Sequence, residues 1–193
     1  MKGKTRRCAL CKKKVLVSDA VIGGIKAFCC FEHLIEFTRS KPAKEIARKE
    51  IRRENKARSE SLKTAGDYVK EAQAAFNAYI RARDKNKPCI SCGCVPGDIV
   101  RGGNFDCGHY RSRGSAGHLR FHLLNAWGQC KKCNRYLSGN VVEYRKRLVG
   151  RIGAERVEQL EIDNNSRKFT IEYLKRVKKI FNYRKRLYER KFR

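Results

Sequence analysis

The sequence is poor in acidic residues and has no long apolar run. Of its 193 residues only 19 are Asp or Glu, and hydrophobic residues make up 41% against 34% charged. That balance is lean for a large core. No apolar stretch approaches the roughly 20 residues that span a bilayer, and no signal-peptide pattern opens the chain. We expect an α+β, mainly helical protein in the cytoplasm, with long basic helices around a small zinc-stapled centre and no membrane contact.

Basic residues dominate instead. Lys and Arg number 47, so the net charge is +28. So large an excess predicts a polyanionic partner, with nucleic acid favoured over a membrane surface. The chain also has ten cysteines. In a reducing cytosol, cysteines at metal-ligand spacing indicate zinc rather than disulfides.

Two Cys-x-x-Cys pairs enclose the centre of the chain, namely Cys89, Cys92, Cys130 and Cys133. A tight turn presents both sulfurs of such a pair to one ion, and two pairs complete a tetrahedral zinc site. His109 and Asn125 lie between the pairs, and Asn134 directly follows the second. This order, His, then Asn, then Cys-x-x-Cys-Asn, is the pattern of an HNH (ββα-metal) nuclease.

A second cysteine cluster lies near the amino terminus. Two cysteines precede a Gly-containing loop and a Cys/His group follows it. We expect a zinc knuckle built from Cys8, Cys11, His33 and either Cys29 or Cys30, because so short a segment has little core and metal-linked folding would stabilise it. The alternative is that the adjacent cysteines are small buried hydrophobes.

Four segments are predicted along the chain: 1–42 the zinc knuckle, 43–63 a basic helical linker, 64–150 the nuclease core with its preceding helix, and 151–193 basic helices. Residues 43–62 contain neither Gly nor Pro, and their Glu–Lys and Glu–Arg pairs at i,i+4 favour a helix. Thr64 and Asp67 are a helix start signal ahead of an aromatic, amphipathic stretch that ends near residues 85–88.

Three more helices are expected towards the carboxyl terminus. Asn140 and Glu143 form a capping-box-like start for a helix through Leu148, and a shorter helix is expected over 155–162. The last helix begins near Thr170 and has one apolar side among many basic residues. It is either packed on the core, a dimerisation element or a DNA-binding arm.

The chemistry of phosphodiester hydrolysis explains why a histidine and an amide would lie in this centre. A base must deprotonate water near neutral pH, and the unperturbed histidine pKa of ~6.5 suits that task. A magnesium-type ion suits the second task, the stabilisation of charge on the phosphorane and on the departing 3′ oxygen. His109 is the candidate base, in a predicted strand over 104–110 where Gly108 permits close backbone approach.

The two asparagines suit supporting roles. Asn134 directly follows Cys133, so the zinc ion would also fix the turn that bears Asn134. Asn125 suits a bracing role in which its amide bonds to backbone groups and holds the histidine strand against the helix. Each asparagine alone would more often be a turn or cap residue, and only their order with His109 favours the functional reading.

Residues 106–111, 119–121, 125, 129–134 and 138–140 together resemble the phage NinG (Rap) recombination proteins, zinc-containing HNH-type endonucleases that cut Holliday junctions and D-loops. The likeness extends to 74–81, 88–93 and 144–152, so it covers most of the chain. It implies that His109 is the base, Asn134 a catalytic-metal ligand and Asn125 the bracing residue. It also implies that the four central cysteines bind zinc.

One position departs from the wider HNH pattern. Many members have Asp or Glu immediately before the catalytic histidine, whereas this chain has Gly108. Asp106 is the nearest carboxylate, and strand alternation places it on the opposite face from His109. It either reaches the magnesium ion through a bulge or orients His109 or a loop arginine. The spare cysteines, Cys94 and Cys107, are expected in the core. The other two histidines, His118 and His122, are expected to be exposed or to face phosphate rather than to bind a metal.

Basic side chains flank both the predicted histidine strand and the second cysteine pair. The predicted DNA contacts are Arg111, Arg113, Arg120, Lys131, Lys132 and Arg135. Guanidinium groups bind phosphate in a bidentate manner, which suits the loop arginines to that role.

We therefore expect a structure-specific endonuclease that cuts branched DNA with Mg²⁺, for which Mn²⁺ is a substitute, and that uses zinc structurally. A homodimer is expected because a C2 dimer supplies the two symmetric nicks that a four-way junction needs. Phage or host recombination proteins are candidate partners. The alternatives are a non-catalytic zinc protein that binds nucleic acid through its charge, and an HNH nuclease that prefers linear duplex. Charge reports affinity for phosphate and does not separate them.

Overall fold

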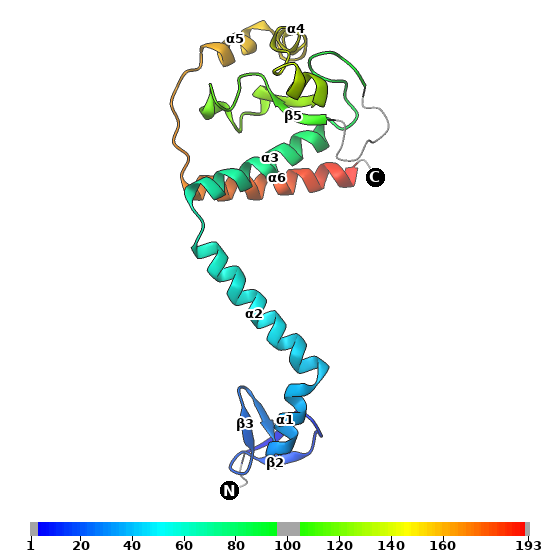
Figure 1. Ribbon diagram of the computed structural model, residues 1–193, viewed down its shortest axis with the longest axis vertical. Coiled ribbons are helices and arrows are strands. Elements are labelled where there is room, and N and C mark those ends of the chain that lie inside the picture. Colours follow the sequence, from blue (N-terminus) through cyan, green and yellow to red (C-terminus); the bar gives the residue numbers. More distant parts are fainter. Residues whose placement is uncertain (1–3, 96–104, 192–193) are drawn as a thin grey trace. The chain divides into compact units, whose positions relative to one another are not determined.

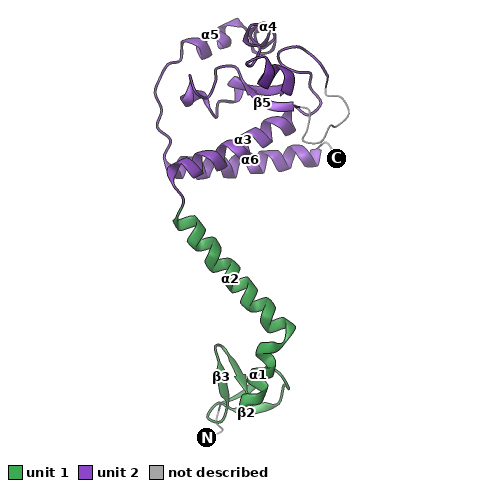
Figure 2. Ribbon diagram, viewed as in Figure 1, with its two compact units in different colours: residues 1–62 green, residues 63–193 purple. Residues whose placement is uncertain are grey.

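The computed structural model of the chain describes residues 4–95 and 105–191. Asn104, the expected first residue of the histidine strand, lies outside these ranges. Six α-helices and three two-stranded antiparallel sheets make up the described part (Figure 1), which confirms the mainly helical α+β class. Two compact units, residues 1–62 and 63–193, divide the chain (Figure 2). No helix within the described ranges has the length and apolar character that a membrane crossing requires.

The first unit begins with two small β-hairpins, which are followed by two helices. Its elements are β1 (Thr5–Arg7) paired with β2 (Lys14–Leu16), β3 (Val21–Gly23) paired with β4 (Lys26–Phe28), α1 (Phe31–Arg39) and α2 (Lys41–Ser61). The hydroxyl of Ser40 accepts from the backbone N–H of Ala43 at 3.4 Å and so caps α2. None of the residues of α2 is buried. The apolar core of this unit is therefore confined to a few residues around Phe28.

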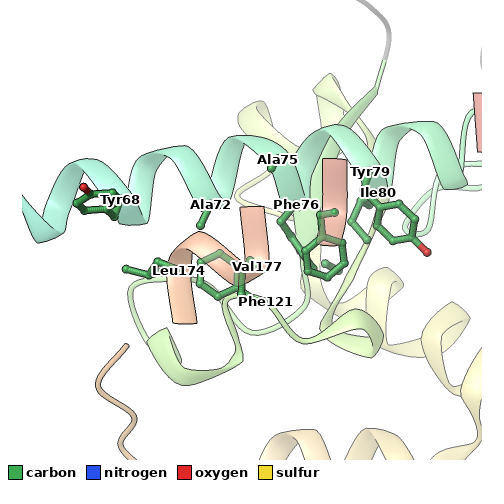
Figure 3. Close-up of a cluster of buried hydrophobic side chains, with 11 residues drawn as sticks. Tyr68, Ala72, Ala75, Phe76, Tyr79, Ile80, Phe121, Leu174 and Val177 are labelled. Atoms are coloured by element: carbon green, nitrogen blue, oxygen red, sulfur yellow. The ribbon is translucent and has the colours of Figure 1, made fainter. Parts of the chain in front are cut away.

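In the second unit, α3 (Ala65–Arg83) and α6 (Ile171–Lys191) lie side by side (Figure 1). The predicted start signal, Thr64 and Asp67, forms a capping box at the start of α3. The aromatic side of α3 is core, as Figure 3 shows for Phe76 beside Phe121 and Val177. The structure therefore shows the first of the three roles expected for the last helix, because its apolar face packs on the core.

The hairpin that carries the candidate site rests on α3. Its strands β5 (Phe105–His109) and β6 (Ala126–Cys130) are antiparallel. The buried Asp84 carboxylate, just after α3, accepts from the backbone N–H of Gly128 at 2.9 Å and from the Arg83 guanidinium at 2.6 Å. This ion pair fixes the middle of β6 to the end of α3.

Gly108 is required where β5 faces β6. A Cβ atom at this position would lie 2.2 Å from the buried Gln129 side chain, which is held by the Ser91 hydroxyl and the Gly139 carbonyl. The expected close approach at Gly108 is confirmed. It also gives a physical reason why the residue before His109 has no side chain.

The second unit also contains the short 3-10 turns η1 (Gly117–Leu119) and η2 (Leu123–Asn125), the π-helical turn η3 (Lys132–Tyr136), α4 (Val141–Ile152) and α5 (Ala154–Ile162). A second apolar cluster joins α4 and α5 to the loop between the strands through buried Leu119, Tyr144 and Leu160. The hairpin is thus packed on both sides, which gives the site a rigid support.

The predicted capping box before α4 is wrong, although the helix itself begins as expected. Asn140 adopts the left-handed conformation, with φ of 43°, and its side chain makes no cap hydrogen bond. The Asn140 amide instead lies 3.6 Å from the Cys133 sulfur. The side chain that looked like a helix cap therefore supports the central cysteine cluster.

Candidate zinc centres and catalytic site

The four central cysteines converge. Their sulfur atoms all lie within 4.8 Å of one another, and those of Cys92 and Cys130 are 3.8 Å apart. A zinc ion with Zn–S bonds of ~2.3 Å in tetrahedral geometry places its sulfurs about 3.8 Å apart, whereas a disulfide requires about 2.05 Å. Backbone N–H groups of Cys130 and Cys133 point at the sulfurs of Cys89 and Cys130 at 3.3 and 3.4 Å. This cluster could hold a zinc ion.

The amino-terminal cluster is equally compact. It consists of Cys8, Cys11, Cys29 and His33, with ligand atoms within 4.8 Å of one another. The Cys11 and Cys29 sulfurs are 3.6 Å apart, and His33 Nδ1 lies 2.9 Å from the Cys29 sulfur. Of the two alternatives, Cys29 joins this group, whereas Cys30 occupies the N-cap position of α1. The cluster could hold a second zinc ion.

Replacing Cys8 with Ser should lower the zinc content from two ions per chain to one, because Cys8 is fully buried and serves only the amino-terminal cluster. The central site belongs to the other unit and should stay filled. Metal analysis of the purified variant measures this directly. An unchanged content would show that the amino-terminal cluster is an ordinary packed segment.

Asp106 and Asn134 lie together at the cysteine end of the hairpin. The Asn134 amide donates to the Asp106 carboxylate at 3.2 Å, and Arg135 donates to the same carboxylate at 2.6 and 3.0 Å. These donors and the positive charges of Arg135 and Lys131 outweigh burial and hold the pKa of Asp106 below its usual value. Carboxylate and amide oxygens are suitable ligand types for a hard divalent cation, although here it is the amide nitrogen of Asn134 that faces Asp106.

His109 ends β5 and turns to the α3 side of the hairpin. Its ring centroid lies 6.0 Å from that of Phe76, and its Nε2 lies 3.1 Å from the Arg120 carbonyl oxygen. In the tautomer that donates this bond, Nδ1 keeps its lone pair. Burial, aided by the charges of Arg113 and Arg120, lowers the pKa of His109 to about 4. The histidine is therefore a neutral base at physiological pH.

No contact among the described residues joins His109 to Asp106 or Asn134. Asp106 faces η3 and His109 faces α3, as strand alternation predicts. With a rise of about 3.3 Å per residue, their Cα atoms lie about 10 Å apart along the strand. The strand itself therefore lies between them, and the structure does not bring His109 together with the acid–amide pair.

Asn125 is fully buried and connects three segments of the loop between the strands. Its Oδ1 accepts from the Arg111 N–H at 2.8 Å, and its Nδ2 donates to the Arg111 carbonyl at 3.0 Å and the Leu119 carbonyl at 3.3 Å. The neighbouring Tyr110 N–H donates to the Asn125 carbonyl at 2.8 Å. These bonds fix the loop directly after His109.

The predicted phosphate contacts fall into two groups. The Arg111 guanidinium is occupied by the carbonyls of Leu160, Glu161 and Asp163 at the end of α5, and that of Arg135 by Asp106. Exposed Arg113 and Lys132, and half-buried Arg120 and Lys131, make no such bond among the described contacts. These four are the better candidates for phosphate.

Of the remaining cysteines and histidines, Cys94 lies beside the central cluster, where its carbonyl accepts from the Cys89 N–H at 2.8 Å. Cys94 is exposed, and half-buried Cys107 packs on the α3–α6 core, where burial raises its pKa to about 12. His118 is held by the Asp163 carbonyl at 2.8 Å, and His122 is exposed. None of the four belongs to a metal cluster found among the described residues.

Two supports of the site had no sequence signal strong enough to predict them. The Tyr144 hydroxyl on α4 donates to the Gly108 carbonyl at 3.2 Å, beside the base. Residues 163–169, between α5 and α6, lie beside the loop that bears Arg120. The polar run of Asn and Ser in 164–166 marks a loop, but its position near Arg120 depends on the packing of α5.

The low pKa of His109 predicts that cleavage remains active at an unusually low pH. A histidine with the ordinary pKa of ~6.5 is only about one-tenth neutral near pH 5.5, whereas one with a pKa of about 4 stays almost wholly neutral there. Because kcat/KM reports the free enzyme, kcat/KM should change little between pH 7 and about pH 5.5 while zinc stays bound. A fall centred near pH 6.5, with full zinc content, would contradict the buried setting of His109.

The same shift affects stability. Between about pH 6.5 and pH 4 the unfolded chain binds more protons at His109 than the folded chain does. The free energy of unfolding should therefore decrease as the pH falls through this window.

The sequence is similar to known phage proteins. A family model described as "Bacteriophage Lambda NinG protein" matches residues 1–191. Protein ninG of Escherichia phage 933W is 35% identical over 186 residues, which cover 90% of this chain and 88% of that protein. Protein ninG of Escherichia phage lambda is 43% identical over 123 residues, which cover 64% of this chain and only 58% of that protein. No solved structure matches the chain. The extent of these matches shows that the chain belongs to the phage NinG family.

Proposed function

We propose that this chain is a metal-dependent DNA endonuclease of the HNH type that cuts branched recombination intermediates, including Holliday junctions and D-loops. One arrangement carries the proposal. A neutral, oriented histidine and the carboxylate of the acid–amide pair lie on one strand, and the cysteine cluster that could hold zinc lies at the end of the same hairpin, where Asn134 follows it directly. Each part has a role in phosphodiester hydrolysis.

His109 acts as the base. Its Nε2–H group donates a hydrogen bond to the Arg120 carbonyl, which fixes the ring. The Nδ1 lone pair can then accept a proton from water. The water oxygen attacks phosphorus, the proton passes to Nδ1, and the bond from phosphorus to the 3′ oxygen breaks. Phe76 packs against the ring, which keeps it in place and partly desolvated.

Asp106 and Asn134 would hold the catalytic Mg²⁺, with Mn²⁺ as a substitute. When bound, the ion supplies Lewis-acid stabilisation of charge on the phosphorane and the departing oxygen. Arg135 neutralises Asp106 in the described structure. Because Arg135 is exposed, it can exchange this carboxylate for a DNA phosphate when a cation occupies the pair.

Branched DNA and a homodimer fit the same proposal. Two symmetric nicks in a four-way junction require two active sites, which a C2 dimer supplies. The proposed setting is the cytoplasm of the bacterial host, where phage or host recombination proteins are candidate partners. The net charge of +28 supports binding to DNA.

A non-catalytic zinc protein that binds nucleic acid is the second candidate. The observation that favours it is that the cysteine clusters and the basic charge account for folding and binding without any chemistry at His109. A nuclease that prefers linear duplex shares the site but not the substrate. Binding and cleavage assays separate the three.

Competition across a salt series tests the preference for branched DNA. Binding to a four-way junction should weaken steeply with salt, because Lys and Arg release counterions from phosphate. The preference over matched linear duplex should persist, since counterion release supplies only the nonspecific part of the binding and recognition of the branch supplies the remainder. If linear duplex competes as well as the junction at every salt concentration, the chain does not recognise branches.

A further inference from the structure

A solvent-open hollow of about 460 Å³ lies between the loop after β5 and the segment that joins α5 to α6. Its lining includes Ser115 and Arg120 from the loop, and Asn164, Ser166, Arg167 and Phe169 from the segment. Among the described residues that line the hollow, none is acidic. Two guanidinium groups and several neutral donors thus share one surface without a carboxylate.

Neither arginine of the hollow is paired with a carboxylate among the described residues. The Arg167 guanidinium lies over the rings of Phe169 and Tyr173, at 5.4 and 4.5 Å from their centroids, and these rings are stacked 5.3 Å apart. Arg120 is half-buried, and burial together with the nearby charge of Arg113 lowers its pKa. No ion pair within the described chain neutralises either arginine. Such a site gains free energy when it binds an anion.

One acidic side chain is paired with a residue that lines the hollow. Asp163 begins the segment, and its carboxylate lies 3.4 Å from Nε2 of the lining residue His118, which also contacts the Asp163 carbonyl at 2.8 Å. Arg111 donates to the same carbonyl. These contacts hold the segment against the loop and leave the arginine side of the hollow positive.

The hollow is connected to the base through one residue. The Arg120 carbonyl accepts from His109 Nε2, while the Arg120 side chain lines the hollow. A group bound by the Arg120 guanidinium would therefore be separated from the reacting phosphate at His109 by about the length of the Arg120 side chain. The volume falls in the range that accepts a small organic ligand rather than a lone ion.

We propose that this hollow binds the nucleotide next to the scissile bond on the cut strand, with its phosphate held by Arg120 and Arg167. Ser115, Asn164 and Ser166 donate to the remaining oxygens, and the Phe169 ring contacts the sugar or base. The site fixes the register of the strand relative to His109. This inference rests on the proposed endonuclease function, since it names a substrate contact of the same site.

The test is the binding of a four-way junction in Ca²⁺, where cleavage does not intervene, by the full chain and by Arg167→Gln. The variant should bind roughly tenfold more weakly at low salt, and the slope of log K against log salt should fall by about one, the value for one lost phosphate contact. Arg190→Gln is the matched control, because Arg190 is exposed near the far end of α6 and carries the same charge.

Neutralising single phosphates of the cut strand as methylphosphonates locates the contact. One position should weaken binding by the intact chain at least as much as Arg167→Gln does, and should cause a smaller loss in that variant, where only the Arg120 contact remains to be lost. Arg120→Gln, which keeps the backbone carbonyl to His109, should behave in the same way. Zinc content and circular dichroism show whether each variant is folded.

The proposal is overturned if folded Arg167→Gln and Arg120→Gln keep the salt slope of the intact chain, or if Arg190→Gln has an equal effect. It is also overturned if each methylphosphonate weakens binding equally in the intact chain and the variants. Absence of cleavage in Mg²⁺ would instead reject the endonuclease function, and the binding results would still decide whether the hollow holds a phosphate.

Discussion

Replacing Cys130 with Ser should unfold the second unit around its hairpin and release the central zinc ion. Cys130 ends β6, and its N–H points at the Cys89 sulfur. Structural zinc contributes ~10–16 kcal/mol in small zinc-dependent folds, as much as the whole stability of ~5–15 kcal/mol of a typical domain. Zinc analysis should find only the amino-terminal ion, and the thermal unfolding transition of the second unit should be lost.

Cys94→Ser is the matched control for this prediction. Cys94 is exposed and lies outside the four-cysteine group, although it is only two residues from Cys92. This variant should keep both zinc ions and its melting temperature. A Cys130→Ser protein with full zinc content and an unchanged melting temperature would show that the cysteines are ordinary core residues.

Replacing His109 with Ala should reduce the cleavage rate by a factor of ~10² to 10⁴, the usual cost of losing a general base. Zinc content and junction affinity should remain close to those of the intact chain, because His109 belongs to neither cysteine cluster. His122→Ala is the control, because His122 is an exposed histidine of the same loop region. This variant should cleave DNA at the rate of the intact chain.

Asn134→Ala should also lose most of its cleavage but respond differently to metal. Excess Mg²⁺ or Mn²⁺ should partly restore this variant by mass action, because the Asp106 carboxylate remains. The same ions cannot replace the missing base in His109→Ala. Rescue of Asp106→Ala by metal would identify Asp106 as a ligand, and wild-type cleavage by His109→Ala would remove the site assignment altogether.

The parts of the fold that follow local rules were predictable from sequence. The helix over 65–83 was foreseen because Thr64 and Asp67 form a capping box and the aromatic spacing marks one buried face. The central cysteine group was foreseen because two residues between thiolates suit a zinc turn. Each of these motifs, the Thr64–Asp67 pair and each Cys-x-x-Cys pair, is formed by residues only three positions apart in the sequence.

The parts that depend on packing were not predictable. Sequence alone could not decide between Cys29 and Cys30, because the choice depends on how β4 leads into α1. Asn140 carries the local pattern of a helix cap but bonds a cysteine sulfur contributed by the preceding turn.

The candidate site shows the same division. The order of His109, Asn125 and Asn134 suggested their roles, but the meeting of Asp106 with Asn134 depends on the register of β5 against β6 and on the turn that follows. Arg111 appeared to be a phosphate ligand until α5 placed its terminal carbonyls around the guanidinium. The hollow beside Arg120 likewise requires two segments that are distant in sequence.

The most direct test of the account is the initial cleavage rate in Mg²⁺ on matched four-way, three-way and linear DNA, with the intact chain and His109→Ala side by side. We expect fast cleavage of the branched substrates by the intact chain, slower cleavage of linear duplex, and almost none by His109→Ala. Equal rates for the intact chain and His109→Ala, or no cleavage of any substrate by a zinc-loaded intact chain, would contradict it.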